Sequence, residues 1–336
     1  MIVSARAYAR AGLAGNPSDG YHGRVVAFPV RNFSARVTVW DSAVLNIIAS
    51  PQHDARRFDS LADLAGSTRR LGYYGGVRLL LAACKRFCEF CAEREIALAE
   101  KNFTLSYTTD IPRQVGLAGS SAIIVAALKA LMGFYGLGEK DIPKPVLANV
   151  ALSVERDELL IAGGLQDRAV QVYDRLVYMD FAEEIMREQG YGRYEPLEGA
   201  ALPAFALAIS GDARESGTIL SDLRFRWERG DPETRRLLSE MATCADDARR
   251  ALLEGDTPAL GEAMTRNFDL RRRLLGDAVI GAPTLRMIEI ARAAGVPAKL
   301  PGSSGSVLCL LEGEEQADDL ERRYREAGCE FVRVRV

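Results

Sequence analysis

The chain has 336 residues, 48% of them hydrophobic and 26% charged, a balance typical of a globular protein with a large buried core. This length favours two domains over one. Because 46 acidic residues nearly balance 43 basic ones, the net charge of −3 gives no reason to expect nucleic acid or an anionic membrane as a partner. We expect small molecules as partners, and the sequence does not indicate an oligomeric state.

Histidine content and hydropathy exclude further classes. The two histidines, His22 and His53, both lie near the N-terminus, which excludes a hydrolase with its histidine last and a zinc site built from several histidines. Residues 1–10 carry two arginines and lack the continuous apolar run of a signal peptide. The longest uncharged run, 114–128, is shorter than the roughly 20 residues that span a bilayer. We therefore expect a cytoplasmic protein.

The residue pattern in the first half of the chain predicts a sheet accompanied by helices. Alternating apolar and polar residues predict antiparallel strands, and an irregular polar connection follows at 51–63. Periodic apolar residues predict helices, the one at 122–135 being apolar enough to be buried. The strands are expected at 2–9, 24–30, 35–40, 46–49, 102–110 and 176–181, and the helices at 76–95, 122–135 and 143–160.

The polar, turn-rich segment 183–203 predicts a domain boundary, which divides the chain into residues 1–195 and 196–336. The second part combines charged amphipathic helices with short apolar strands, which predicts an α+β sandwich with helices on one face. Its strands are expected at 205–210, 306–311 and 330–336, and its helices within 218–275 and at 284–294 and 316–327.

Cys84, Cys88 and Cys91 have the C-x3-C-x2-C spacing that certain enzymes use to bind an iron–sulfur cluster. The same spacing places the three thiols on one face of the helix predicted at 76–95, as a buried stripe. Buried cysteines commonly act as small hydrophobic residues, so we favour the helix.

Three glycine-rich loops each adjoin a predicted strand, and they carry the main functional signal. Loop 1 covers residues 10–19, loop 2 residues 112–122 and loop 3 residues 299–306. In loop 2 a strand ends, glycines follow, and an apolar helix begins at Ser120 and Ser121, which presents unpaired backbone N–H groups to a phosphate. A serine-capped turn is the simpler alternative for loop 2 alone. Three such loops together fit a nucleotide site better, and no P-loop motif is present.

The three loops resemble, in order and separation, the three signature motifs of the GHMP kinases, the superfamily of galactokinase, homoserine kinase, mevalonate kinase and phosphomevalonate kinase. The resemblance implies an α+β, two-domain fold: an N-terminal domain like the second domain of ribosomal protein S5 and a ferredoxin-like C-terminal domain, with the active site between them. Several stretches also look like the glucuronokinases, which phosphorylate D-glucuronate at its anomeric hydroxyl. These stretches are residues 15–19, 72–79, 111–117, 162–168 and 267–273.

The resemblance implies a mechanism that uses ATP and Mg²⁺. Ser121 and Glu155 would bind Mg²⁺, Asp167 would take the proton of the sugar hydroxyl, and Arg10 would keep Asp167 ionised near the γ-phosphate. The nucleotide would be held by Pro112, Gly116, Leu117, Ala118, Gly119, Ser120, Ser121 and Ala122 of loop 2 and by Gly302 and Ser303 of loop 3.

The substrate residues implied are Asp19 and Tyr21 for the sugar and a guanidinium, from Arg168 or Arg78, for its carboxylate. The sequence does not choose between the two arginines. It departs from the family at Ala118, where glycine is usual, so we expect a backbone there that avoids positive φ. Serines 303, 304 and 306 also interrupt the usual glycines of loop 3.

Other functions stay open at this point. The chain could phosphorylate another sugar, such as galacturonate, galactose or a heptose, or it could be a non-catalytic sugar sensor on the same fold. A decarboxylase of the same fold is disfavoured because loop 1 resembles a loop that binds sugar hydroxyls.

Overall fold

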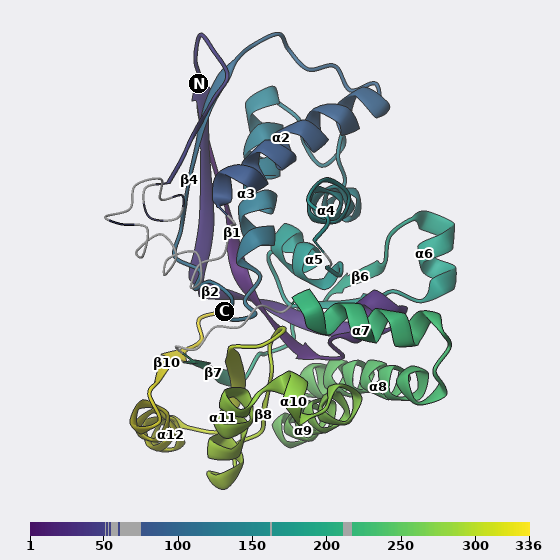
Figure 1. Ribbon diagram of the computed structural model, residues 1–336, viewed down its shortest axis with the longest axis vertical. Helices are drawn as coiled ribbons and strands as arrows, with labels where there is room; N and C mark the ends of the chain where they lie inside the picture. The colour runs from purple at the N-terminus through teal and green to yellow at the C-terminus, as the bar shows by residue number, and fades with distance from the viewer. Residues whose placement is uncertain (51, 53, 55–59, 61–74, 162, 211–216) are drawn as a thin grey trace.

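The computed structural model describes residues 1–50, 52, 54, 60, 75–161, 163–210 and 217–336, and within the last range it leaves out the side chains of 217–221. Two sheets lie one above the other along the long axis of the molecule (Figure 1). Most of the connection predicted at 51–63, and residues 72–74 and 162 of the resembling stretches, lie outside the described residues.

The first sheet has the order β3-β4-β2-β5-β6, with β1 also paired to β2. All pairs are antiparallel except β3 with β4. The strands are β1 (Ile2–Ala14), β2 (Arg24–Asp41), β3 (Asn46–Ile48), β4 (Phe103–Thr109), β5 (Val177–Asp180) and β6 (Arg193–Pro196). A 3-10 turn, Ser18–Tyr21, connects β1 to β2.

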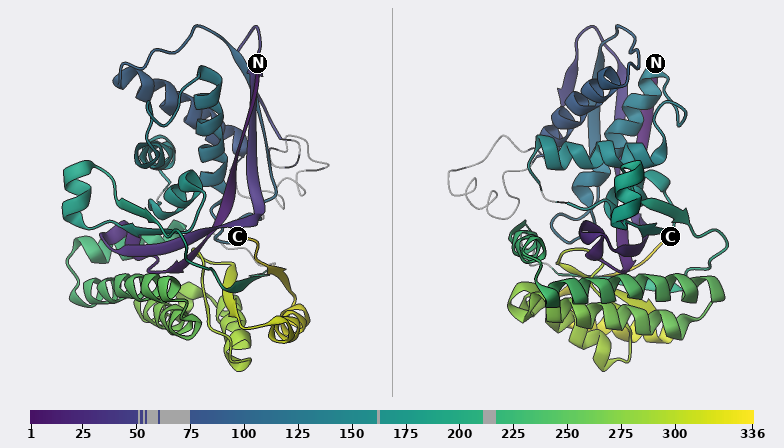
Figure 2. Two further views of the ribbon diagram at one scale, coloured as in Figure 1. Left: turned by 180° about the vertical axis from the view of Figure 1, so that it is seen from behind. Right: turned by 90° about the vertical axis from the view of Figure 1, so that its right-hand side faces the viewer.

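The two strands predicted at 24–30 and 35–40 are one long strand, β2. Its pairing with β1 slips after Val30, because residues 31–33 of β2 have no partner in β1. Such a bulge bends and twists the pair. The far half of β1 therefore runs toward the second sheet, as Figure 2 shows, and brings the start of loop 1 to the junction of the two parts.

Helices cover one face of the first sheet (Figure 2). They are α2 (Gly76–Glu93), α3 (Gly119–Tyr135), α4 (Lys144–Ser153), α5 (Gln166–Tyr173) and, at the periphery, α6 (Glu183–Gln189). The helix predicted at 143–160 ends as an α-helix at Ser153 and continues as a π-helical turn, Val154–Glu158. As expected from its apolar sequence, α3 is buried along most of its length.

The second sheet has the order β10-β7-β9-β8 and is antiparallel throughout. Ala206 and Ala208 face a core formed with α11 and α12, whereas Phe205 and Leu207 face the main core, where Phe205 stacks on Phe28 of β2 at 5.3 Å. The strands are β7 (Ala204–Ser210), β8 (Ala298–Lys299), β9 (Ser306–Leu311) and β10 (Cys329–Arg333). The helices are α7 (Gly217–Glu228), α8 (Pro232–Glu254), α9 (Thr257–Leu275), α10 (Asp277–Ile280), α11 (Ala282–Ala293) and α12 (Glu314–Glu326).

The boundary predicted between residues 195 and 196 falls at the end of β6. Pro196, the last residue of β6, still pairs with Val177 of the first sheet, and β7 of the second sheet begins at Ala204. The turn-rich segment 183–203 also contains α6, which the sequence analysis did not predict. The division into 1–195 and 196–336 stays a prediction.

The helix interpretation of the cysteines is confirmed, with one correction. All three lie on α2, but only Cys91 is buried, and Cys88 is exposed, so the predicted buried stripe is wrong at that position. Burial raises the pKa of Cys84 to about 12 and of Cys91 to about 11, which keeps these thiols protonated at neutral pH. Among the described residues no group of three or more His, Cys, Asp or Glu could hold a metal ion.

None of the described helices combines the length and the apolar composition that crossing a bilayer requires.

Candidate functional site

The three glycine loops, far apart in sequence, meet where the two sheets adjoin. In loop 1 the N–H of Gly12 donates to Pro301 O of loop 3 at 2.8 Å, and Arg10 N donates to Leu117 O of loop 2 at 3.3 Å. Ser306 Oγ of loop 3 donates to Val115 O of loop 2 at 2.6 Å. These bonds join the backbones of all three loops into one unit, as the sequence predicted from their glycines.

Glycine is required where loop 2 and loop 3 touch. A Cβ atom on Gly302 would lie 1.9 Å from Gly116 O, far inside contact distance. Gly116 itself has φ +71°, and a Cβ there would lie 2.9 Å from Ser304 O. Any side chain at either position would separate the two loops.

Loop 2 ends at the N-terminus of α3, where Ala118 precedes the first helical residue. The expectation that Ala118 avoids positive φ is wrong, because its φ is +61°. Its carbonyl accepts hydrogen bonds from Ser121 Oγ at 3.1 Å and from Gln171 Nε2 of α5 at 2.9 Å, so tertiary contacts hold the unfavourable conformation. No side chain caps α3, and its first backbone N–H groups stay available for an anion.

The other predicted residues of loop 2 differ in what they offer a nucleotide. Leu117 is buried in the core, so only its backbone could take part. The N–H of Ala122 already donates to Ala118 O at 3.2 Å. Pro112 is half-buried and has no N–H to donate, whereas Gly119 and Ser120 begin the helix at its open end.

Of the two serines at the start of α3, Ser120 and not Ser121 contacts Glu155, and the prediction that Ser121 and Glu155 bind Mg²⁺ stays a prediction. Glu155 Oε1 accepts a hydrogen bond from Ser120 Oγ at 2.7 Å, whereas Ser121 is 1% exposed and its hydroxyl donates to Ala118 O. Successive residues of a helix point in different directions, so only one of the two serines can face the carboxylate. Glu155 itself is placed by the π-helical turn, a feature frequent at functional sites.

Asp167 lies in the first turn of α5, between two guanidinium groups. Arg10 Nε donates to Asp167 Oδ1 at 2.5 Å, and Arg168 Nη1 lies 3.4 Å from Oδ2. The Arg10 side chain is 6% exposed and that of Asp167 18% exposed. Arg10 Nη1 also donates to Gly116 O at 2.6 Å and to Pro301 O at 3.2 Å, which ties the carboxylate to loops 2 and 3.

Asp19 lies beside Asp167 and accepts hydrogen bonds from the backbone N–H of Gln166 at 3.5 Å and from its side chain at 3.3 Å. Burial, and then the charge of Asp167, raises the pKa of Asp19 to about 6. A Cβ on Gly164 would lie 1.9 Å from Asp19 Oδ2, so only glycine leaves room for this carboxylate. Tyr21, two residues after Asp19, packs against Trp227 of α7 with ring centres 5.4 Å apart.

Both arginines that were predicted to bind a substrate carboxylate already have contacts within the protein. Arg168 is 3% exposed, forms a buried ion pair with Glu155, and donates to Gly164 O at 2.6 Å. Burial and the charge of Arg10 lower the pKa of Arg168 to about 10. Arg78 is exposed on α2 and donates to Leu159 O at 3.3 Å.

Sequence reasoning missed three residues that hold the loops together. Lys299 and Arg271 are buried and bind backbone carbonyl oxygens of loops 1 and 3, and Asn16 accepts a hydrogen bond from Lys299. The run of three arginines at 271–273 on a helix gives no signal for the one that is buried. Lys299, the first residue of loop 3, could have been suspected only from its position.

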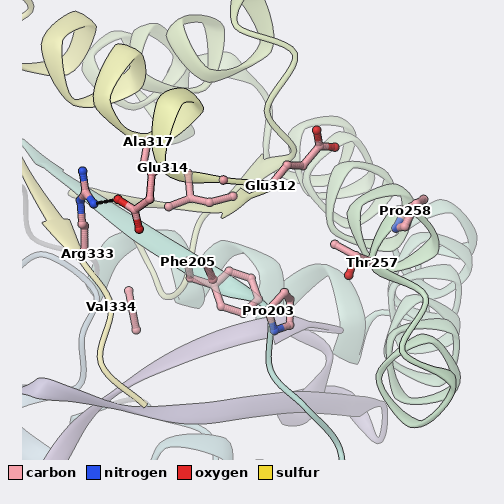
Figure 3. A pocket seen from close by; sticks show the side chains of 12 residues that line it. Pro203, Phe205, Thr257, Pro258, Glu312, Glu314, Ala317, Arg333 and Val334 are labelled. Carbon is pink, nitrogen blue, oxygen red and sulfur yellow. Dashed lines mark hydrogen bonds and ion pairs between the residues drawn. The ribbon is translucent and has the colours of Figure 1, made fainter.

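A cavity of the described surface lies away from these residues. Its volume is about 700 Å³, and it opens between the ends of β9 and β10 and the starts of α9 and α12 (Figure 3). Its lining includes Phe205, Thr257, Glu314 and Arg333, and none of the predicted site residues. It lies at the Leu311 end of β9, whereas loop 3 joins the opposite end at Ser306.

Comparisons with known proteins agree with this geometry. The model of the GHMP kinases N terminal domain matches residues 78–175, and the model of the GHMP kinases C terminal domain matches residues 248–328. Glucuronokinase 1 of Arabidopsis thaliana is 43% identical over 335 residues, which covers 99% of this chain and 92% of that protein. The chain belongs to the GHMP kinases.

Two further comparisons give a second relative of this GHMP kinase and a solved structure with the same fold. Probable glucuronokinase 2 of Arabidopsis thaliana is 45% identical over 329 residues, covering 97% of this chain and 89% of that protein. The solved phosphomevalonate kinase of Streptococcus pneumoniae has the same fold, with a TM-score of 0.75 at 15% identity over 99% of this chain and 100% of that one. The α+β two-domain fold and the kinase activity predicted from the loops are thereby confirmed.

The two matched ranges contain different parts of the candidate site. Residues 78–175 include loop 2, Glu155 and Asp167, and residues 248–328 include Arg271 and loop 3. Loop 1, with Arg10 and Asp19, precedes both matched ranges.

Proposed function

We propose that this GHMP kinase transfers the γ-phosphoryl group of ATP to the anomeric hydroxyl of D-glucuronate, giving D-glucuronate 1-phosphate and ADP. The relatives that align along nearly the whole chain are named glucuronokinases. The observation that carries the proposal is the carboxylate of Asp167, fixed by Arg10 at the meeting point of the three loops.

Asp167 is the general base of the proposed reaction. The anomeric oxygen forms a bond to the γ-phosphorus while its proton passes to Asp167, and the bond from the γ-phosphorus to the bridging oxygen breaks to release ADP. Arg10 holds the carboxylate in place and adds positive charge near the transferred group. The free N–H groups at the start of α3, with Gly302 and Ser303 of loop 3, would hold the phosphates.

Glu155 and the serine hydroxyls of loop 2 suit Mg²⁺, which prefers hard oxygen ligands and is usually bound by one or two carboxylates together with phosphates. A cationic guanidinium, that of Arg168, already neutralises Glu155 in the protein alone, so the position favours positive charge. Bound Mg²⁺ would neutralise charge on the β- and γ-phosphates. The contact with Glu155 makes Ser120 the first candidate ligand and leaves Ser121 the second.

Asp19 and Tyr21 are the proposed contacts of the sugar hydroxyls, since Asp19 lies beside Asp167 and Tyr21 belongs to the same 3-10 turn as Asp19. Arg168 and Arg78 stay the proposed partners of the sugar carboxylate. Arg168 would reach it only by giving up Glu155, and Arg78 by turning from Leu159 O. The six free cysteines suit a reducing compartment, so we place the reaction in the cytoplasm.

A panel of acceptors tests the proposal. ADP release with Mg-ATP is measured for glucuronate, galacturonate, galactose, glucose, a heptose and mevalonate. The proposal expects the highest kcat/KM with glucuronate. A kcat/KM for galactose tenfold or more above that for glucuronate would mean that glucuronate is not the substrate. The absence of turnover with any acceptor would favour a sugar sensor.

A further inference from the structure

Two buried cations lie behind loop 3. Arg271 of α9 is 5% exposed and donates from Nη1 to Gly302 O at 2.6 Å and from Nη2 to Ser303 O at 2.9 Å. Lys299 is 2% exposed, and its ammonium contacts Asn16 Oδ1 at 2.5 Å, Gly12 O at 2.8 Å and Leu300 O at 2.9 Å. Three acceptors match the three N–H groups of an ammonium ion.

Neither cation is in contact with an acidic side chain of the described residues. In the part of the chain that the structure describes, Arg271 and Lys299 form no ion pair, and every acceptor they contact is a neutral oxygen. Burial, followed by the charge of Arg10, lowers the pKa of Arg271 to about 10. Burial also lowers the pKa of Lys299, well below its ordinary value. Buried charge without a counter-charge is costly, so its presence calls for a reason.

The hydrogen bonds of Arg271 set the direction of the loop 3 peptides. Because C=O and N–H of one trans peptide point in opposite directions, holding the carbonyls of Gly302 and Ser303 turns the N–H groups of Ser303 and Ser304 away from Arg271. Within the described residues, neither N–H donates to an acceptor, and the buried Ser304 hydroxyl has no partner either. Successive unpaired N–H groups form a concave site for anions.

These N–H groups border loop 2. A Cβ on Gly116 would lie 3.0 Å from Ser303 N, so the row of donors in loop 3 adjoins the loop that leads into α3. Positive charge, unpaired donors and a helix N-terminus therefore come together at one place.

We propose that Arg271 and Lys299 are positioning residues for the triphosphate: they orient the loop 3 donors, and the phosphate charge of the bound nucleotide is the counter-charge that the described residues do not supply. This inference rests on the proposed use of ATP. It does not depend on which sugar is the acceptor, so its failure and the failure of the glucuronate assignment are distinguishable.

The test measures binding to the full-length protein by isothermal titration calorimetry, without sugar. The ligands are inorganic tripolyphosphate, ATP, ADP, AMP and adenosine. In Arg271→Met, we expect the affinity for tripolyphosphate and ATP to fall at least about tenfold, ADP and AMP progressively less, and adenosine to bind as in the wild type. Arg271→Lys keeps the charge and is expected to recover most of the affinity, and Lys299→Met is expected to show the same graded loss.

The neighbouring Arg272→Met is the matched control, because Arg272 is only partly buried and is paired with Asp277. Circular dichroism confirms that each variant is folded. An equal loss for adenosine and ATP would show that Arg271 merely supports the fold, and unchanged ATP affinity in both Arg271→Met and Lys299→Met would overturn the proposal. If Arg271→Met does not fold, Lys299→Met carries the same comparison.

Discussion

The buried cations on the two sides of the candidate site have different kinds of partner. Around Asp167, the guanidinium groups of Arg10 and Arg168 face the carboxylates of Asp167 and Glu155. Behind loop 3, Arg271 and Lys299 face only carbonyl and amide oxygens. A balanced set of charges can hold a base ionised and in place, whereas an unbalanced one favours an anionic ligand. The first side is therefore suited to moving a proton and the second to holding phosphates.

The largest effect is expected on the balanced side. Asp167→Asn removes the proton acceptor and keeps the size of the side chain, so kcat should fall at least about 10²-fold, the lower range of general-base effects. Nucleotide affinity should change little, because we propose that loops 2 and 3, and not Asp167, hold the phosphates. Steady-state kinetics and nucleotide titration measure both quantities. Wild-type turnover in this variant would remove Asp167 from the mechanism.

Gly164→Ala tests the space beside the base. The added Cβ would meet Asp19 Oδ2 at 1.9 Å, so Asp19 must move, and kcat/KM for the sugar should fall roughly tenfold, about 1.4 kcal/mol. Gly138→Ala is the matched control, because nothing lies within 4 Å of a Cβ there. Equal kinetics in the two alanine variants would mean that Asp19 does not contact the substrate.

Substitutions of the two serines of loop 2 should have smaller effects, which differ from each other in kind. Ser120→Ala removes the hydroxyl that contacts Glu155, so the Mg²⁺ concentration for half-maximal activity should rise several-fold. Ser121→Ala removes the bond to Ala118 O and should lower the melting temperature more than it changes the Mg²⁺ requirement. The reverse outcome would restore the ligand expected from the sequence.

The smallest effect concerns Asp19 and pH. Its pKa of about 6 lies above its ordinary value of 3.8, so the folded state favours the protonated form. The stability that this contributes is present below pH 3.8 and is lost as the pH rises through 6. The asparagine of the Asp19→Asn variant does not titrate, so this variant does not lose that stability as the pH rises. The melting temperature of Asp19→Asn should therefore rise relative to that of the wild type between pH 5 and pH 8. If the difference in melting temperature between the two proteins is constant over this pH range, the raised pKa of Asp19 is contradicted.

The sequence predicted what is local and missed what depends on distant contacts. Glycines beside strands, and an apolar helix after Ser121, were enough to predict that three loops build one site. The conformation of Ala118 was predicted wrongly because Gln171, on another helix, binds its carbonyl. The burial of Arg271 could not be predicted from its neighbours in sequence, since only packing decides that Arg271 is buried while Arg272 stays partly exposed.

The most direct test of the account is the crystal structure of the kinase with D-glucuronate, Mg²⁺ and a non-hydrolysable ATP analogue. The account predicts the Asp167 carboxylate within about 2.6–3.2 Å of the anomeric oxygen, the reach of a general base, with the analogue's phosphates against loops 2 and 3. An anomeric hydroxyl bound away from Asp167, or phosphates held elsewhere, would contradict it.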